Sequence, residues 1–233
     1  MFDETLAHVT ALNVGGDLAG EEGLTEAFVQ VCNFLYDNPD RLSWRVKSGP
    51  PSLQNPEGLE VLAQRYFAAY RRSDFPNMAG TIPDEMVSIV MEEVFGYSEE
   101  ESTRIKSEHQ RAMVAENCVG ALLERYLDVK LRSSGWSWCC GSFVRAVDFV
   151  RKDQQGVWLA LQIKNRDNSE NSSSSAIRSG TFIEKWFRSF SKTGLTNWKN
   201  LPPLMQGYTM SEQDFTVFVR SYLRLNNPRR NKS

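Results

Sequence analysis

Apolar residues recur every three or four positions in three stretches of the first hundred residues, and glycine and proline separate these stretches. The spacing predicts helices over 24–36, 57–71 and 83–95, because it gathers the apolar side chains on one helical face. Thr81 is the expected N-cap of the third helix, and Gly96 is its expected end. The N-terminal part of the chain is therefore predicted to be helical.

A longer helical pattern covers residues 98–131 and changes character along its length. Its first half is polar. Its second half carries an apolar stripe that a helix would bury, made of Val119, Leu122, Leu123, Tyr126 and Leu127. The helix is expected to end at Ser133-Ser134-Gly135.

β-branched and aromatic residues dominate the next segment, as is typical of strands. Strands are expected over 136–138, 143–150 and 157–163. The polar residues 152–156, which include a glycine, predict a hairpin turn between the last two.

Helical spacing resumes over 177–190, and a final helix is expected over 212–225. Helices, a strand meander, a polar loop and further helices together predict an α/β (α+β) fold. In this fold a mixed central sheet is flanked by helices, and a helical region precedes it.

A length of 233 residues suits one large domain or two closely packed ones. No apolar run of about 18 residues occurs, so no transmembrane helix is expected. The start, Met1–Thr5, is acidic and lacks the basic and then apolar order of a signal peptide. The four cysteines show no metal-ligand spacing, so we expect a reduced, cytoplasmic protein.

The two histidines, His8 and His109, both lie in amphipathic or polar helical segments. We expect them at the surface. Zinc sites built on several histidines and nucleophile–histidine–acid triads are therefore disfavoured.

Charge divides the chain into an acidic and a basic half, although the net charge is only −2. Residues 1–100 carry 17 acidic and 6 basic side chains, whereas residues 101–233 carry 12 acidic and 21 basic ones. We expect an acidic helical region over 1–100 and a catalytic, polyanion-binding region over 101–233, within one continuous domain or two. The halves could also neutralise one another across an internal interface.

Candidate chemistry lies on the expected strands. Asp148 ends the second strand, and Gln162 and Lys164 point to one side of the third, because side chains alternate along a strand. The hairpin would bring Asp148 close to them, and Glu124 on the preceding helix would add a second carboxylate. Carboxylate and amide oxygens suit Mg²⁺, and a lysine can stabilise charge on a phosphate. The sequence thus predicts metal-dependent phosphodiester hydrolysis.

This ordered set resembles the PD-(D/E)XK nuclease superfamily over about residues 115–190, with Gly120 and Glu124 on a helix followed by Asp148, Gln162 and Lys164. More specifically, the stretches 161–175 and 183–188 look like type II restriction endonucleases of the SinI and AvaII kind. That resemblance implies a PD-(D/E)XK core and Mg²⁺-dependent double-strand cuts at the palindrome GGWCC, where W is A or T. It also implies a cut between the two guanines that leaves 5′-phosphate ends.

By the same resemblance, Asp148, Glu124 and Gln162 would hold Mg²⁺, and Lys164 would orient the attacking water. Gln162 stands where the superfamily usually has a second acid, so the metal would depend more heavily on Glu124. A palindromic site in double-stranded DNA implies a two-fold homodimer.

The polar segment after Lys164 carries side chains that suit DNA. Arginine can pair with guanine, asparagine can pair with adenine, and serine can reach phosphates. The expected DNA-binding residues are Asn165, Arg166, Asn168, Asn171, Ser172, Arg178 and Arg188, the last two on the helix over 177–190. A serine- and asparagine-rich run is also typical of a flexible linker.

Simpler interpretations stay open for single residues. Asp148 could be a surface residue near a turn, Lys164 a charge that protects a strand edge, and Glu124 part of a solvated helix face with Asp128. Two other functions also stay open. One is a repair or recombination nuclease of the same fold, and the other is a non-catalytic DNA-binding protein.

Overall fold

The computed structural model describes residues 1–47, 49–76, 84–167 and 182–227. These residues form two compact units. Unit 1 comprises Met1–Arg72 and Glu124–Phe218, and unit 2 comprises Ser73–Leu123 and Val219–Ser233. Each unit thus combines segments from the first hundred residues and from the rest of the chain.

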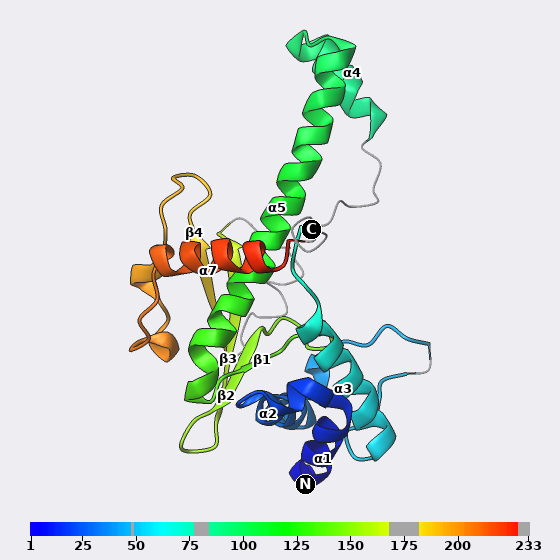
Figure 1. The fold of residues 1–233 in the computed structure, drawn as a ribbon, viewed down its shortest axis with the longest axis vertical. Coiled ribbons are helices and arrows are strands. Elements are labelled where there is room, and N and C mark those ends of the chain that lie inside the picture. The colour runs from blue at the N-terminus through cyan, green and yellow to red at the C-terminus, as the bar shows by residue number, and fades with distance from the viewer. Residues whose placement is uncertain (48, 77–83, 168–181, 228–233) are drawn as a thin grey trace. The chain divides into compact units, whose positions relative to one another are not determined.

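Three helices, α1 (Glu4–Gly15), α2 (Leu24–Asp37) and α3 (Pro56–Arg71), pack against one another in unit 1 (Figure 1). The ring of Phe28 on α2 contacts those of Tyr66 and Phe67 on α3, at centroid distances of 5.5 and 6.0 Å. All three rings are buried. The helices predicted over 24–36 and 57–71 are therefore confirmed, and their apolar faces form one part of the core.

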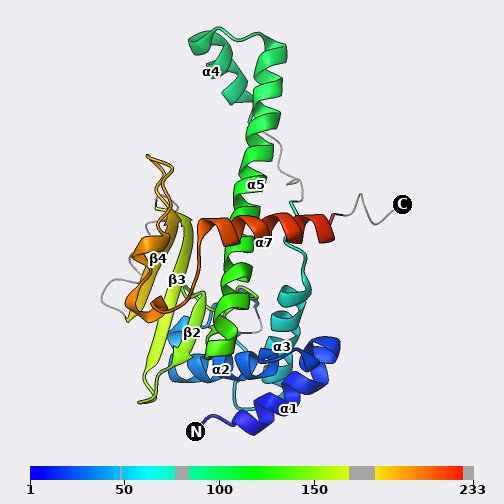
Figure 2. The same cartoon turned by 60° about the vertical axis from the view of Figure 1, so that its left-hand side comes forward.

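A four-stranded mixed sheet follows in unit 1, with the strand order β1-β2-β3-β4 (Figure 2). Its strands are β1 (Ser137–Trp138), β2 (Phe149–Lys152), β3 (Trp158–Arg166) and β4 (Ile183–Ser189). The pairs β1–β2 and β2–β3 are antiparallel, whereas the pair β3–β4 is parallel. This arrangement confirms the predicted mixed sheet.

The β2–β3 hairpin turns at the predicted place. Gly156 adopts a φ of +79°, a left-handed conformation that favours glycine. The side chain of Asp153 accepts hydrogen bonds from the backbone N–H groups of Gln155 and Val157, at 2.9 and 2.8 Å. This Asp-centred turn fixes the register of the two strands.

The strand predicted over 143–150 is wrong for most of its length, because β2 begins only at Phe149. Ser142 and Ala146 have φ values of +57° and +59°, which interrupt an extended backbone. Val144 instead forms an isolated antiparallel bridge with Leu42.

The helix predicted over 177–190 is also wrong for the described residues, since 183–189 forms β4. Ile183, Trp186 and Ser189 are its buried residues, so burial recurs every third position and imitates a helical pattern. Parallel pairing with β3 decides the conformation instead.

The remaining α-helices are α4 (Glu85–Phe95), α5 (Glu99–Leu131) and α7 (Glu212–Leu225). They agree with the three helices predicted for these regions. The N-cap of α4 is Asp84, whose side chain accepts a hydrogen bond from Met86 N at 3.0 Å, so the prediction of Thr81 as the cap is wrong. Gly96 ends α4 as expected, with a φ of +72°. Short 3₁₀ helices are η1 (Gly16–Gly20), η2 (Pro39–Arg41), η3 (Arg132–Ser134), η4 (Trp198–Asn200) and η5 (Pro203–Met205).

Aromatic rings from distant segments form a second part of the core of unit 1. Trp186 of β4 lies 4.9 Å from Trp198 of η4, measured between ring centroids. Trp198 in turn contacts Tyr126 of α5 and Phe215 of α7, at 5.9 and 6.3 Å. These contacts join the C-terminal part of α5 and the start of α7 to the β4 side of the sheet.

Candidate functional site

Asp148 lies immediately before the first residue of β2 and does not end a strand as expected. Its backbone N–H donates to Leu161 O at 2.8 Å, and its carbonyl oxygen accepts from Cys139 N at 2.8 Å. Its carboxylate oxygen Oδ2 accepts the backbone N–H of Ile163 at 2.6 Å. Three strands thus fix the position and orientation of this carboxylate.

Gln162 and Lys164 lie on β3, beside Asp148. Phe149 pairs with Leu161 and Val150 with Ala160. Asp148, the residue before this ladder, bonds to the residues on either side of Gln162, because its N–H donates to Leu161 O and its Oδ2 accepts the Ile163 N–H. Gln162 is buried, whereas Lys164 is half-buried at the next position on the same face of the strand. The hairpin therefore brings together the acid, the amide and the lysine that were predicted to meet.

The electrostatic environment of Asp148 is unusual for a carboxyl group. Burial raises its pKa above the usual value, while the Ile163 N–H and the charge of Lys164 act in the opposite direction. A carboxylate in this setting carries a charge that is poorly solvated. A nearby cation would stabilise that charge, as a metal does when it binds a carboxylate.

Glu124 lies on the part of α5 that belongs to unit 1, and it is half-buried. Its Oε2 accepts the indole Nε1–H of Trp138, the last residue of β1, at 3.0 Å. The hydrogen bond holds the Glu124 carboxylate against the edge strand of the sheet.

The pKa of the Cys139 thiol depends on both carboxylates. Burial raises the pKa of its thiol well above the ordinary value, and the negative charges of Asp148 and Glu124 raise it further. The negative charges of both acids thus influence one buried thiol, which directly follows the end of β1. The charges of Glu124 and Asp148 thus act on the same thiol, although the two residues come from a helix and from the segment before a strand.

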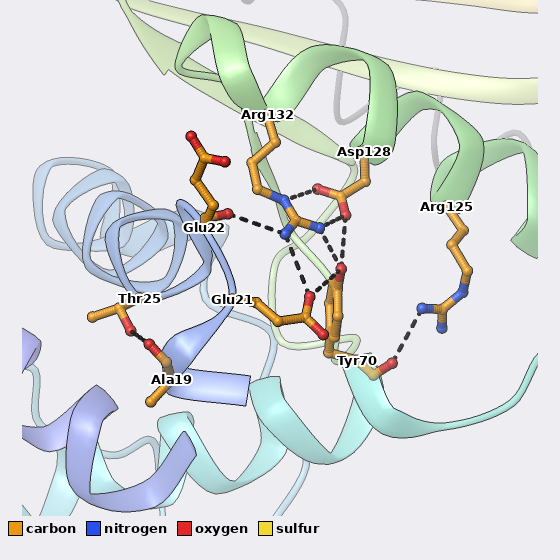
Figure 3. Close-up of polar contacts among 8 residues, drawn as sticks. All are labelled: Ala19, Glu21, Glu22, Thr25, Tyr70, Arg125, Asp128 and Arg132. Atoms are coloured by element: carbon orange, nitrogen blue, oxygen red, sulfur yellow. Dashed lines mark hydrogen bonds and ion pairs between the residues drawn. The ribbon is translucent and has the colours of Figure 1, made fainter. Parts of the chain in front are cut away.

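A polar network anchors α5 one turn beyond Glu124 (Figure 3). Asp128 pairs with Arg132 and accepts a hydrogen bond from the hydroxyl of Tyr70 on α3, at 3.3 Å. Arg132 also donates to the backbone oxygen of Glu22, at 3.4 Å, and forms an ion pair with Glu21 at 3.8 Å. The network thereby links α5 to α3 and to the loop before α2.

Asp128 has a side chain that is only 2% exposed. The interpretation of Glu124 and Asp128 as a solvated helix face is therefore wrong for Asp128. Burial also raises the pKa of Tyr70 to about 12, so its hydroxyl stays protonated and donates to Asp128 at neutral pH. The buried and hydrogen-bonded Asp128 thus helps to fix the direction in which α5 presents Glu124.

The donor set suits a hard cation that keeps some of its other ligands. Within the described ranges, no three His, Cys, Asp or Glu side chains gather closely enough to form a metal site by themselves. Asp148 and Glu124 would therefore have to be supplemented by the Gln162 oxygen, water and a substrate phosphate. Mg²⁺ is usually bound in this way, through one or two carboxylates with retained waters and phosphate oxygens.

Three of the predicted DNA-binding residues lie at the ends of β3 and β4. Arg188 donates from Nε to Asn165 Oδ1 at 2.9 Å, pairs with Glu212 of α7, and has a side chain that is 14% exposed. Its position on a strand corrects the expectation that it would project from a helix. Arg166 is half-buried at the last position of β3. The other four, Asn168, Asn171, Ser172 and Arg178, lie outside the described residues.

Sequence reasoning missed Trp138 and Cys139. The sequence predicts Trp138 only as the last residue of a strand, yet its indole N–H donates a hydrogen bond to Glu124. Cys139 offered no motif, because its importance depends on two acids brought near it from sites 15 residues before it and 9 residues after it. Neither residue carries a signal in the sequence beyond its place at the end of an expected strand.

No helix in the described part of the chain combines the length and the apolar character that a bilayer-spanning segment needs.

The mixed sheet, the flanking helices and the acid–lysine hairpin together have the restriction-endonuclease-like architecture. Comparison with known proteins agrees with this class. The profile of the SinI restriction endonuclease family matches residues 9–225. The chain is 46% identical over 203 residues to the Type II restriction enzyme SinI of Salmonella infantis, an alignment that covers 86% of this chain and 88% of that enzyme. It is also 46% identical over 202 residues to the Type II restriction enzyme Eco47I of Escherichia coli, with coverages of 86% and 87%.

The chain belongs to the SinI restriction endonuclease family. The resemblance inferred from the stretches 161–175 and 183–188 is thereby confirmed. As a member, the protein is a type II restriction endonuclease, which is a site-specific deoxyribonuclease. This classification disfavours both alternatives, the repair nuclease and the non-catalytic DNA-binding protein.

Proposed function

We propose that this enzyme makes Mg²⁺-dependent double-strand cuts in DNA at the palindrome GGWCC and leaves 5′-phosphate ends. The observation that carries the proposal is the pair of hydrogen bonds from Asp148 to Leu161 and Ile163 of β3, the residues on either side of Gln162, with Lys164 next along the strand. The matching family profile and the two relatives support the class of reaction.

Asp148 and Glu124 are the proposed metal ligands, and Gln162 assists through its side-chain oxygen. The buried carboxylate of Asp148, with its raised pKa, supports this assignment, because a bound cation would compensate its poorly solvated charge. When bound, Mg²⁺ would polarise the scissile phosphate and lower the pKa of a bound water. Glu124 matters more here than in a site with two strand acids, because an amide oxygen is a weaker ligand than a carboxylate.

Lys164 is the proposed group that orients the attacking water and stabilises negative charge on the phosphoryl oxygens. The water oxygen attacks phosphorus in line with the leaving O3′, the P–O3′ bond breaks, and O3′ takes up a proton. The products are a 3′-hydroxyl and a 5′-phosphate. The charge of Lys164 lowers the pKa of the Asp148 carboxyl group, which supports a position of the ammonium group near the proposed metal ligand.

The segment that follows Lys164 is the proposed DNA-reading element. Its members are Asn165, Arg166, Asn168, Asn171, Ser172, Arg178 and Arg188. Arg188 would position Asn165 at the end of β3 and would not itself read a base. The hydrogen bond from Arg188 to Asn165 supports this role. Arg166 would follow directly, at the last position of the strand.

A palindromic site further implies a two-fold homodimer, in which each subunit cuts one strand. We place this activity in the cytoplasm of a prokaryotic cell, since both relatives come from bacteria.

Digestion of a plasmid of known sequence, followed by sequencing of the ends, tests the proposal. With Mg²⁺ we expect discrete fragments that end at GGWCC and that ligate without prior phosphorylation. EDTA should stop the reaction, and added Mg²⁺ should restore it. Smeared products, or ends at unrelated sequences, would contradict the proposed specificity.

The variant Lys164→Ala tests the mechanism. Cleavage should fall about 100- to 1,000-fold, as when a charge-stabilising group is lost from other active sites. Lys130→Ala is a matched control, because Lys130 is an exposed lysine on α5. Wild-type cleavage by Lys164→Ala would exclude the role assigned to this lysine.

A further inference from the structure

The segment that leads into Asp148 is joined to a segment from the acidic half of the sequence. The backbone N–H of Ser43 donates to Phe143 O at 2.8 Å, and that of Arg145 donates to Arg41 O at 2.8 Å. Between these two bonds, Leu42 and Val144 form an antiparallel bridge. Residues 41–47 lie in the pale blue connection from α2 to α3 in Figure 1. They are thus hydrogen-bonded to a segment that ends three residues before Asp148, at Arg145.

Basic side chains gather at this junction, although the first hundred residues carry only 6 of them. Arg45 and Lys47 lie on one side of the junction and Arg145 on the other, and all three are exposed. Arg41 is different, because it is buried and pairs with Asp40 at 3.2 Å. Neither 41–47 nor 142–147 contains an acidic residue.

Among the described residues, the three exposed cations have no internal partners. Within the described ranges, the side chains of Arg45, Lys47 and Arg145 make no hydrogen bond or ion pair with another residue. Unbalanced like charges repel one another, and an external polyanion would remove this cost. The acid-poor character of the junction therefore indicates a binding surface for negative charge.

The backbone of the junction is also packed against α3. The guanidinium of Arg65 lies 3.7 Å from the ring centroid of Trp44. Gly141 has a φ of +96°, and a Cβ built there would lie 2.8 Å from the Phe143 ring and 3.3 Å from the Arg65 backbone oxygen. This crowding fixes residues 141–145 against α3.

We propose that Arg45, Lys47 and Arg145 form a phosphate-binding surface that contacts the DNA backbone beside the cleavage site. The proposal rests on the proposed function, which puts a DNA phosphate at Asp148. It also means that the acidic half of the sequence contributes directly to DNA binding. The chemistry is that of phosphate contacts, because the junction offers exposed cations without the amide side chains that read base edges in pairs.

Salt dependence of DNA binding is the test. Arg45→Gln, Lys47→Gln, Arg145→Gln and the triple variant are compared with wild type, in EDTA, on one duplex with GGWCC and one without it. Each lost phosphate contact lowers the slope of log Kd against log salt by about 0.9. Raising salt from about 50 to 200 mM should therefore weaken wild-type binding roughly 40-fold more than binding by the triple variant.

The effect should be equal on the two duplexes, because phosphates carry no sequence information. Lys199→Gln is the matched control, since Lys199 is an exposed lysine on η4, after the edge strand β4, and it should keep the wild-type slope. The triple variant should also keep the wild-type melting temperature, which shows that the altered slope does not arise from loss of folding.

Three results would overturn the proposal: an unchanged slope for the triple variant, an equal loss for Lys199→Gln, or a loss confined to the GGWCC duplex. Failure of the proposed function gives a different pattern, in which the wild-type enzyme itself does not cut at GGWCC. The two failures are therefore distinguishable.

Discussion

At the scale of single residues, Asp148 shows how a site can cost stability. Burial raises its pKa and outweighs the favourable Ile163 N–H and Lys164 charge. The folded protein thus binds this proton more tightly than the unfolded chain does. Stability is lost as the pH rises from the ordinary Asp value of 3.8 through the raised pKa, because the ionised form is disfavoured in the fold.

Asp148→Asn should therefore abolish cleavage and yet stabilise the metal-free protein at neutral pH. The amide oxygen can still accept the Ile163 N–H, so the hydrogen bond is kept while the buried charge is removed. We expect a rise in Tm of a few degrees at pH 7, since 1 kcal/mol corresponds to about 2–4 °C in a protein of this size.

The pH dependence of the difference distinguishes this cause from general repacking. Thermal unfolding between pH 4 and 8 should show a stabilisation that grows with pH and shrinks toward acid, where Asp148 is protonated in both states. A difference that is constant across this range, or a destabilised variant, would show that burial of the charge does not control the stability of this site.

At the scale of secondary-structure elements, α5 depends on its buried ion pair. Asp128 is 2% exposed and Arg132 is 14% exposed, and Tyr70 of α3 completes the network. Removal of one partner of such a pair leaves an uncompensated buried charge. Asp128→Ala should therefore lower the free energy of unfolding by about 3–5 kcal/mol, as measured by urea denaturation.

A surface pair on the same helix gives the matched control. Glu108 and Arg111 pair at 2.7 Å, with side chains that are 62% and 60% exposed. Glu108→Ala should cost no more than about 1 kcal/mol, because solvent screens the interaction. Equal losses in the two variants would mean that the Asp128 network does not hold α5 in place.

Elements with strong local periodicity could be predicted from the sequence, and those set by distant contacts could not. The helices over 24–36, 57–71 and 98–131 were found because their apolar faces repeat over several turns. β4 was missed because its burial recurs every third residue, and its conformation depends on parallel pairing with β3 across the intervening loop.

The candidate site divides in the same way. Asp148 and Lys164 were predictable partners, since a short hairpin with a clear turn joins their strands. The contact of Trp138 with Glu124 needs the packing of α5 against β1, and no local pattern reports it. The bond between Tyr70 and Asp128 joins residues 58 positions apart, which is equally beyond a local reading.

At the scale of the whole molecule, the boundary between the acidic and basic halves of the sequence does not coincide with the boundary between the two compact units. Unit 1 contains most of the acidic first half together with the basic residues around the candidate site. The expectation that the acidic half stays away from DNA therefore does not follow from the fold, because residues 41–47 are hydrogen-bonded to the segment that leads into Asp148.

The homodimer proposed for a palindromic site can be tested by mixing active and inactive subunits. If each subunit cuts one strand, a heterodimer of wild type and Lys164→Ala should nick supercoiled plasmid and stop there, because only one active site contains its lysine. Differently tagged chains, expressed together, allow the heterodimer to be purified. Its mass by analytical ultracentrifugation should be twice the 26.6 kDa of one chain.

The two homodimers are the controls: the wild-type protein should give linear DNA, and Lys164→Ala should leave the plasmid supercoiled. The heterodimer should accumulate open circles with a single break at GGWCC, in either strand, because the palindrome lets it bind in both orientations. Linear DNA produced by the heterodimer as quickly as by the wild type would mean that one active site cuts both strands in turn. A single chain of 26.6 kDa that makes double-strand cuts would exclude the two-fold arrangement altogether.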